Sequence, residues 1–183
     1  MKARGHASAH HCDSEQANRQ LSMLEFRPIN LAQHRDRCVE FRADSFVCSF
    51  GSADLFYEMD GNGVATYLHW LEQKMRTLPH SCVHVWHENQ IIGQIEMGRW
   101  KQDFRVGHVH LFYLTPKFRG QGLGQQLEQH AATFLQELGC RSARLSVSPT
   151  NLLAVRFYLK HGWVDLGQRQ DAPEVHWFEK IYP

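Results

Sequence analysis

A glycine-rich loop lies between a predicted strand and a predicted amphipathic helix in the segment HVHLFYLTPKFRGQGLG, residues 108–124. Glycines let successive backbone N–H groups turn toward one point, and the first turn of a helix adds unpaired N–H donors with a partial positive charge. This combination is typical of a phosphate-binding site, and a pyrophosphate is its natural ligand. The alternative is a turn that only connects a strand to a helix.

Two common phosphate-binding loops do not match this segment. A nucleoside-triphosphate loop ends in Gly-Lys-Ser/Thr, whereas Gly124 is followed by two glutamines. A dinucleotide-binding fingerprint has glycines at its first, third and sixth positions, and counting from Gly120 the sixth residue is Gln125. A pyrophosphate-binding loop of another family is therefore expected.

The periodicity of apolar residues predicts the elements around this loop. Alternating patterns predict strands at 24–29, 82–87, 91–97, 106–114, 144–147, 164–167 and 175–181, with a hairpin turn at 88–90. Helical spacing predicts a helix that opens at Asn30 and stops at Gly51 and a second that runs from 64 to Leu78-Pro79. It also predicts helices at 123–138 and 152–161, closed by Gly139 and Gly162. In the first helix the apolar stripe is Val39, Ala43, Phe46, Val47 and Phe50, and a polar, glycine-rich connection follows it. This order predicts an α/β (α+β) fold, a mixed sheet with helices on both faces.

Composition excludes several classes of protein. Lys+Arg 20 against Asp+Glu 19 gives a net charge of +1, which argues against a nucleic-acid-binding face. The longest apolar runs fall short of the roughly 20 residues that cross a membrane, so no membrane association is expected. The 5 cysteines are odd in number and lack a C-x-x-C pair, which favours reduced thiols in a cytoplasmic protein.

The first 22 residues are polar and lack the hydrophobic stretch of a secretory signal. We interpret residues 1–22 as a flexible tail and residues 23–183 as a single domain. His6, His10, His11 and Cys12 could in principle ligate a metal, but the polar composition favours the tail.

Two motifs in this order resemble the GCN5-related N-acetyltransferase (GNAT) superfamily. The first is R-x-x-G-x-G, from Arg119 to Gly124, directly after the strand that ends in Leu114-Thr115-Pro116. The second is N-x-x-A-x-x-F-Y, from Asn151 to Tyr158, followed by Gly162-Trp163. The resemblance implies a mostly antiparallel sheet of about six to seven strands, with acetyl-CoA as the cosubstrate and no metal.

The resemblance also implies which residues bind the cofactor. In the family the strand before the loop parts from its neighbour and leaves a slot for the pantetheine arm, which pairs with the strand backbone as an added strand would. The N–H of Leu114 is then the expected donor to the thioester oxygen. The cofactor-binding residues carried over in this way are Phe112, Tyr113, Leu114, Arg119, Gly120, Gln121, Gly122, Leu123, Gly124, Gln125 and Asn151.

The resemblance gives Tyr158 the role of the acid that protonates the departing thiolate, and the alternative is a core tyrosine. Asn151 lies seven residues earlier, so both face the same side of a helix. Asn151 could equally be the N-cap of that helix. The two roles of Asn151 are compatible.

The base that deprotonates the acceptor amine is expected on the strand before the loop. His108 and His110 are spaced i, i+2 on one face, an arrangement similar to that of the arylalkylamine N-acetyltransferases, where such histidines relay the proton through water. Half a metal site or a pair of core histidines are the alternatives. Glu96, on the neighbouring strand, is the other candidate base.

These inferences predict acetyl transfer from acetyl-CoA to a primary amine, a small molecule or a lysine side chain, by direct attack in a ternary complex. The alternatives are a CoA-binding regulatory module that does not catalyse, or a different acyl donor. In the family the acceptor site is shaped by the first two helices and the last strands, here residues 46–66 with Glu58 and Asp60, plus His176 and Trp177. A homodimer is a family-based expectation.

Overall fold

The computed structural model describes residues 23–183, and at its centre is a seven-stranded sheet with the order β1-β2-β3-β4-β5-β7-β6. All neighbouring strands are antiparallel except β4 and β5, which are parallel. The predicted mixed, mostly antiparallel sheet is thereby confirmed. The strands are β1 (Glu25–Pro28), β2 (Cys82–His87), β3 (Gln90–Arg99), β4 (Val106–Leu114), β5 (Ser142–Val147), β6 (Val164–Gln168) and β7 (His176–Ile181).

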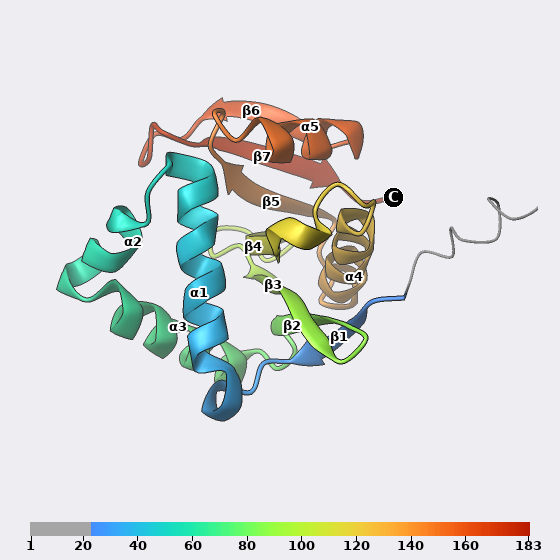
Figure 1. Cartoon of the computed structure of the whole chain (residues 1–183). Helices are drawn as coiled ribbons and strands as arrows, with labels where there is room; N and C mark the ends of the chain where they lie inside the picture. Colours follow the sequence, from blue (N-terminus) through green and yellow to red (C-terminus); the bar gives the residue numbers. More distant parts are fainter. Residues whose placement is uncertain (1–22) are drawn as a thin grey trace, which may run out of the picture.

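Helices cover both sides of this sheet. They are α1 (Leu31–Phe50), α2 (Asp54–Glu58), α3 (Gly63–Thr77), α4 (Gly124–Glu137) and α5 (Leu152–Lys160), with 3-10 turns at Met59–Gly61 and Pro116–Phe118. Figure 1 shows α1, α2 and α3 together on one side and α4 on the other. The larger core cluster joins α4 and α5 to the sheet, and a smaller one joins α1 and α3 to β2.

Helix α1 begins and ends where the sequence predicts. Asn30 accepts a hydrogen bond from the N–H of Ala32, and Gly51 closes the helix in the left-handed conformation with φ 80°. The buried face differs from the predicted stripe, because Cys38 and Phe41 are fully buried while Val47 is 44% exposed. Helix α1 contacts both β4 and α3, so its apolar residues spread over two directions.

The connection after α1 contains structure that the sequence did not predict. Helix α2 and a 3-10 turn occupy residues 54–61, where we expected a polar loop. Phe56 is fully buried, with its ring centroid 5.7 Å from that of Phe46 and 5.8 Å from that of Tyr67. One buried residue in a five-residue helix leaves no periodic pattern to detect.

No helix within residues 23–183 is both long and apolar enough to span a membrane. The predicted tail, residues 1–22, lies outside the described residues, as do the histidines and the cysteine that it contains.

Candidate active site

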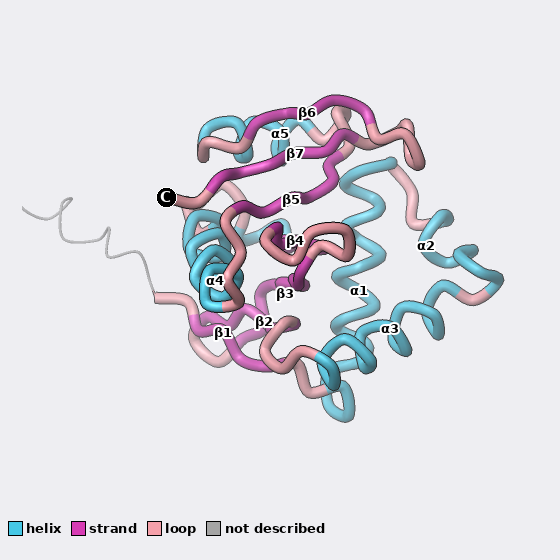
Figure 2. Tube along the Cα trace, turned by 180° about the vertical axis from the view of Figure 1, so that it is seen from behind, coloured by secondary structure: helices cyan, strands magenta, loops and turns pink. Residues whose placement is uncertain are grey.

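Strands β4 and β5 are neighbours in the sheet but pair over only three residues. Val106–His108 of β4 register with residues 142–144 of β5, whereas β4 stays paired with β3 as far as Leu114. In the part of the chain that the structure describes, the rest of β5 pairs with β7 alone. The sheet is therefore parted beyond His108, and the backbone groups that line the gap have no partner strand. Figure 2 shows β5, β6 and β7 set apart from β3 and β4.

The hydrogen-bond ladder between β3 and β4 decides which backbone groups face this gap. The N–H of Thr115 donates to the carbonyl of Ile92 at 2.8 Å. Because bonded and non-bonded pairs alternate along an antiparallel ladder, Leu114 and Phe112 direct their N–H and C=O groups away from β3 and toward the gap. The backbone of Tyr113 faces β3, so of the three residues predicted to pair with pantetheine only the alternate ones can reach it.

A bulge in β4 lies beside the point where the sheet parts. The register passes from Glu96 paired with Leu111 to Met97 paired with Val109, which leaves His110 without a partner on β3. Bulges of this kind bend a strand and redirect side chains, and they are frequent next to active sites.

His108 and His110 project from the same face of β4, as their spacing predicts, and their ring centroids are 3.9 Å apart. Three tryptophans surround the pair. The centroid of Trp70 on α3 is 5.2 Å from that of His110, and the centroids of Trp100 and Trp177 are 4.9 and 5.7 Å from that of His108. All five side chains belong to half-buried residues. They form a partly exposed aromatic cluster at the start of the gap.

Burial holds both imidazoles in their neutral form. It lowers the pKa of His108 to about 4, with repulsion from Lys74 and then Arg169 as the next causes. It lowers the pKa of His110 well below the ordinary value, followed by repulsion from His108 and Lys74. Both rings are therefore neutral at pH 7 and have a lone pair that can accept a proton, while the lowered pKa makes each a weaker base than a free imidazole.

Glu96, the alternative base, is fully buried and its oxygens are occupied. Oε1 accepts hydrogen bonds from the Tyr67 hydroxyl at 2.6 Å and from Gln94 Nε2 at 2.7 Å. Oε2 lies 3.5 Å from Arg42 Nη1, which also donates to the carbonyl of His110 at 3.0 Å. Glu96 thus links α1 and α3 to the sheet. Because both of its oxygens are already engaged in these contacts, the histidines are the better candidates for the base.

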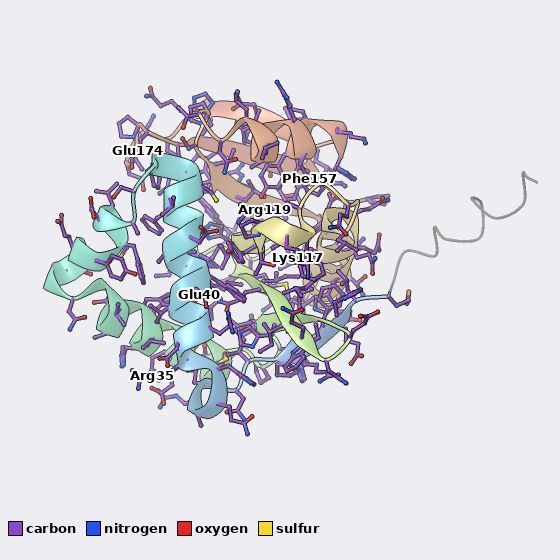
Figure 3. The ribbon with its side chains drawn as sticks, in the orientation of Figure 1. Arg35, Glu40, Lys117, Arg119, Phe157 and Glu174 are labelled. Carbon is purple, nitrogen blue, oxygen red and sulfur yellow. The ribbon has the colours of Figure 1, made fainter. Side chains whose placement is uncertain are left out.

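The glycine-rich loop has the open backbone that an anion requires. Gly120 and Gly122 have φ of 73° and 80°, which glycine adopts without strain. No side chain caps the first turn of α4. A Cβ at Gly124 would lie 2.8 Å from Cε2 of Phe157, which reaches this loop from α5 (Figure 3). The predicted loop residues are therefore brought to one place, with Leu123 buried beneath them.

The side chain of Arg119 points back to α1 (Figure 3). Its Nη2 lies 2.8 Å from Oδ2 of Asp44, and its Nε donates to the carbonyl of Leu114 at 2.7 Å. The Tyr113 hydroxyl donates to the same oxygen of Asp44 at 2.7 Å. With its carbonyl taken by Arg119, Leu114 retains a free N–H on the gap side, as the predicted oxyanion donor requires.

Asn151 and Tyr158 lie at the two ends of α5. Asn151 is its N-cap, with Oδ1 accepting from the N–H of Ala154 at 3.2 Å. Tyr158 is 9% exposed and packs against Trp163 and Phe178 in the larger core. Burial, followed by the negative charge of Glu128, raises the pKa of Tyr158, so the phenol keeps its proton at neutral pH.

Asp44 is a functional candidate that the sequence did not predict. It belongs to no local motif, and its partner Arg119 is 75 residues away.

Of the residues expected at the acceptor site, Trp177 joins the aromatic cluster, whereas His176 contacts Asp165 on β6 at 3.0 Å.

The two acidic residues expected at the acceptor site, Glu58 and Asp60, are exposed on α2 and the 3-10 turn that follows it. Within residues 23–183 no cluster of three or more histidine, cysteine or acidic side chains is arranged to hold a metal.

Solved structures superpose on this fold over most of its length. The PaiA N-acetyltransferase from Thermoplasma acidophilum, in complex with coenzyme A, superposes with a TM-score of 0.70 at 17% identity, over 87% of this chain and 99% of that one. YncA from Salmonella typhimurium, a putative acetyltransferase with acetyl-CoA, gives 0.64 at 15% identity, over 87% and 94%. At these identities the likeness shows the fold alone.

The sequence itself places the chain in a family. Residues 39–163 match the model of the Acetyltransferase (GNAT) family, and the chain belongs to that family. An uncharacterized N-acetyltransferase of Archaeoglobus fulgidus is 39% identical over 54 residues, 30% of this chain and 37% of that protein. The N-alpha-acetyltransferase MAK3 of Arabidopsis thaliana is 27% identical over 88 residues, 47% and 46% of the two chains. The chain thus matches less than half the length of either curated relative.

Proposed function

We propose that this protein is an N-acetyltransferase that moves an acetyl group from acetyl-CoA to a primary amine by direct attack in a ternary complex. The observation that carries the proposal is that β4 parts from β5 directly after His108. The neutral histidine pair and the glycine-rich loop belong to the same strand-loop-helix unit, which begins with β4 and ends with α4. Membership of the family supports it.

The fit to acetyl-CoA rests on the two open stretches of backbone. The gap offers the N–H groups of Phe112 and Leu114 and the carbonyl of Phe112 to an extended pantetheine arm, while the carbonyl of Leu114 is held by Arg119. The loop at 120–125 offers N–H groups to the pyrophosphate. When bound, acetyl-CoA supplies the acetyl group as an activated thioester.

The remaining chemistry belongs to the residues of this chain. His108 and His110 take the proton that the acceptor amine loses, because only the free amine is a nucleophile. The N–H of Leu114 donates to the thioester oxygen as negative charge develops on it. Tyr158 then gives its proton to the thiolate as the C–S bond breaks, and the amide product carries the acetyl group. Asn151, at the other end of α5, contacts the cofactor arm in addition to capping the helix.

The test combines binding with turnover. Calorimetric titration with coenzyme A should show binding, and incubation with acetyl-CoA and a broad panel of primary amines should release free thiol. Absence of any affinity for coenzyme A would overturn the proposal. Binding without thiol release on the whole panel would indicate a regulatory CoA-binding module instead, and release with a longer acyl-CoA but not with acetyl-CoA would indicate another acyl donor.

A further inference from the structure

The aromatic cluster beside the histidine pair is large and flat-sided. The ring centroids of Trp100 and Trp177 are 4.7 Å apart with their planes tilted by 72°, and both indoles lie close to the His108 ring. Trp70 borders His110 from α3. Such surroundings favour an aromatic ring, which gains from offset and edge-to-face contacts with indoles beyond the burial of its surface.

Three cationic side chains lie against these tryptophans. Lys74 Nζ is 5.2 Å from the Trp70 centroid, Arg144 Cζ is 5.6 Å from that of Trp100, and Arg169 Cζ is 4.2 Å from that of Trp177. Two of the three are paired with carboxylates of the chain itself. Arg144 contacts Glu179 at 3.3 Å and Arg169 contacts Asp171 at 2.7 Å.

Lys74 is the exception. Among the described residues no carboxylate lies within ion-pair distance of its ammonium. Burial lowers the pKa of Lys74, and the negative charge of the buried Glu96 acts on it in the opposite direction from farther away. A Cβ placed on Gly98 would lie 2.7 Å from Nζ, so the ammonium occupies the space that a side chain at Gly98 would fill. Gly98 is paired with His108 across β3 and β4. The Lys74 ammonium therefore lies over the strand next to His108, and residues on neighbouring strands are about 5 Å apart at Cβ.

We infer that the acetyl acceptor is a primary amine that also carries an aromatic ring and a carboxylate, of which an aromatic α-amino acid is the simplest case. The inference rests on the proposed function and assigns the substrate class of the same site. The ring packs among the tryptophans, the carboxylate pairs with Lys74, and the amine faces His108. An α-amino acid matches the short separation between Lys74 and His108 because one carbon carries both its amine and its carboxylate. Polyamines and lysine side chains bring only positive charge to a site where Lys74 already repels it.

Matched substrates test this class directly on the unmodified protein. Rates of thiol release from acetyl-CoA are compared for phenylalanine against phenethylamine and for tryptophan against tryptamine, pairs that differ only in the carboxylate. Leucine is included to test whether the acceptor needs an aromatic ring, and putrescine to test whether a substrate with only positive charge is accepted. The amino acid of each pair should have a kcat/KM at least about tenfold higher than its amine, the size expected for a charge-assisted contact. Equal or reversed rates within the pairs, or a preference for putrescine, would overturn the inference and leave the proposed function standing.

Variants then assign the effect to Lys74. The change Lys74→Met should remove the preference for phenylalanine, mainly through KM, and should leave phenethylamine within about twofold of the parent. Lys74→Arg, which keeps the charge, should retain part of the preference. Lys160→Met, an exposed lysine at the end of α5, is the matched control and should change neither substrate. Thermal melting checks that each variant is folded, and a preference that survives Lys74→Met in the folded protein would contradict the assignment.

A binding measurement separates this inference from the proposed function. Phenylalanine binding in the presence of coenzyme A is followed by tryptophan fluorescence, which reports on the cluster without any acetyl transfer. Binding that depends on Lys74 but gives no turnover would support the inferred ligand class and contradict the proposed acetyltransferase activity. Absence of both binding and turnover would overturn both.

Discussion

Arg119 and Asp44 join the glycine-rich loop to helix α1 through an ion pair of 2.8 Å between Nη2 and Oδ2. The same carboxylate oxygen accepts the hydroxyl of Tyr113, and the same guanidinium donates to the carbonyl of Leu114. Asp44 thus gathers the end of β4 and the start of the loop onto one helix. Because α1 also carries Arg42, which donates to the carbonyl of His110, the cofactor side and the histidine side of the site share one support.

Asp44→Asn should therefore weaken cofactor binding more than it slows the chemical step. Loss of the charge leaves Arg119 and the end of β4 less firmly held. We therefore expect the KM for acetyl-CoA to rise about three- to tenfold with kcat nearly unchanged. The effect is of this size because the two side chains of the pair are about a third exposed, and solvent weakens such a pair. Steady-state kinetics with varied acetyl-CoA measures this. Glu40→Gln is the control on the same helix, because within residues 23–183 Glu40 pairs only with Arg37, at the exposed surface. A fall in kcat with unchanged KM would show that Asp44 acts on the reaction itself.

Tyr158→Phe should lower kcat and leave the affinity for acetyl-CoA unchanged. The substitution keeps the ring that packs against Trp163 and Phe178, and it removes only the proton donor. A general acid contributes about 100-fold or more, so a loss of that size is expected where chemistry limits the rate. Tyr182→Phe is the matched control, a tyrosine whose pKa burial also raises but which the proposal does not use. Full turnover by the Tyr158 variant in single-turnover experiments would remove Tyr158 from the mechanism.

Local signals in the sequence predicted most of the elements. Gly51, Gly139 and Gly162 end the three helices they were expected to end, each with φ near 80°, because only the residues next to a helix end decide that conformation. The hairpin at Glu88 and Asn89 has positive φ at both residues, as a tight turn between strands requires. The adjacency of His108 and His110 followed from the period of a strand alone.

Contacts between residues that are distant in the sequence could not be predicted from these local signals. The pairing of Asp44 with Arg119 and the gathering of Trp70, Trp100 and Trp177 depend on how α1, α3 and β7 pack against β4. The occupation of both oxygens of Glu96 likewise becomes visible only when α1 and α3 lie over β3. Periodicity gives the buried face of an element but not which neighbour meets it.

Gly124→Ala should weaken the binding of coenzyme A. The new methyl group would lie 2.8 Å from Cε2 of Phe157, so the Phe157 ring, α5 or the start of α4 must shift where the loop is to hold the pyrophosphate. We expect calorimetry to show an affinity about tenfold lower, a loss near 1.4 kcal/mol. The double change Gly124→Ala with Phe157→Leu should restore part of the affinity, because the smaller side chain makes room. Failure of the second substitution to restore binding would mean that the glycine is required for another reason.

Acid should destabilise the protein between about pH 6.5 and pH 4. Burial lowers the pKa of His84 and of His108 to about 4 in the folded protein, from 6.5 in the unfolded chain. Between these values the unfolded state binds more protons, so the free energy of unfolding falls as the pH falls through this window. The loss is at most about 3 kcal/mol for each histidine. Urea unfolding at stepped pH measures the slope. His84→Gln, which cannot titrate, should flatten it, and His69→Gln controls for the loss of an exposed histidine. A slope unchanged by His84→Gln would show that burial of this imidazole does not set the acid response.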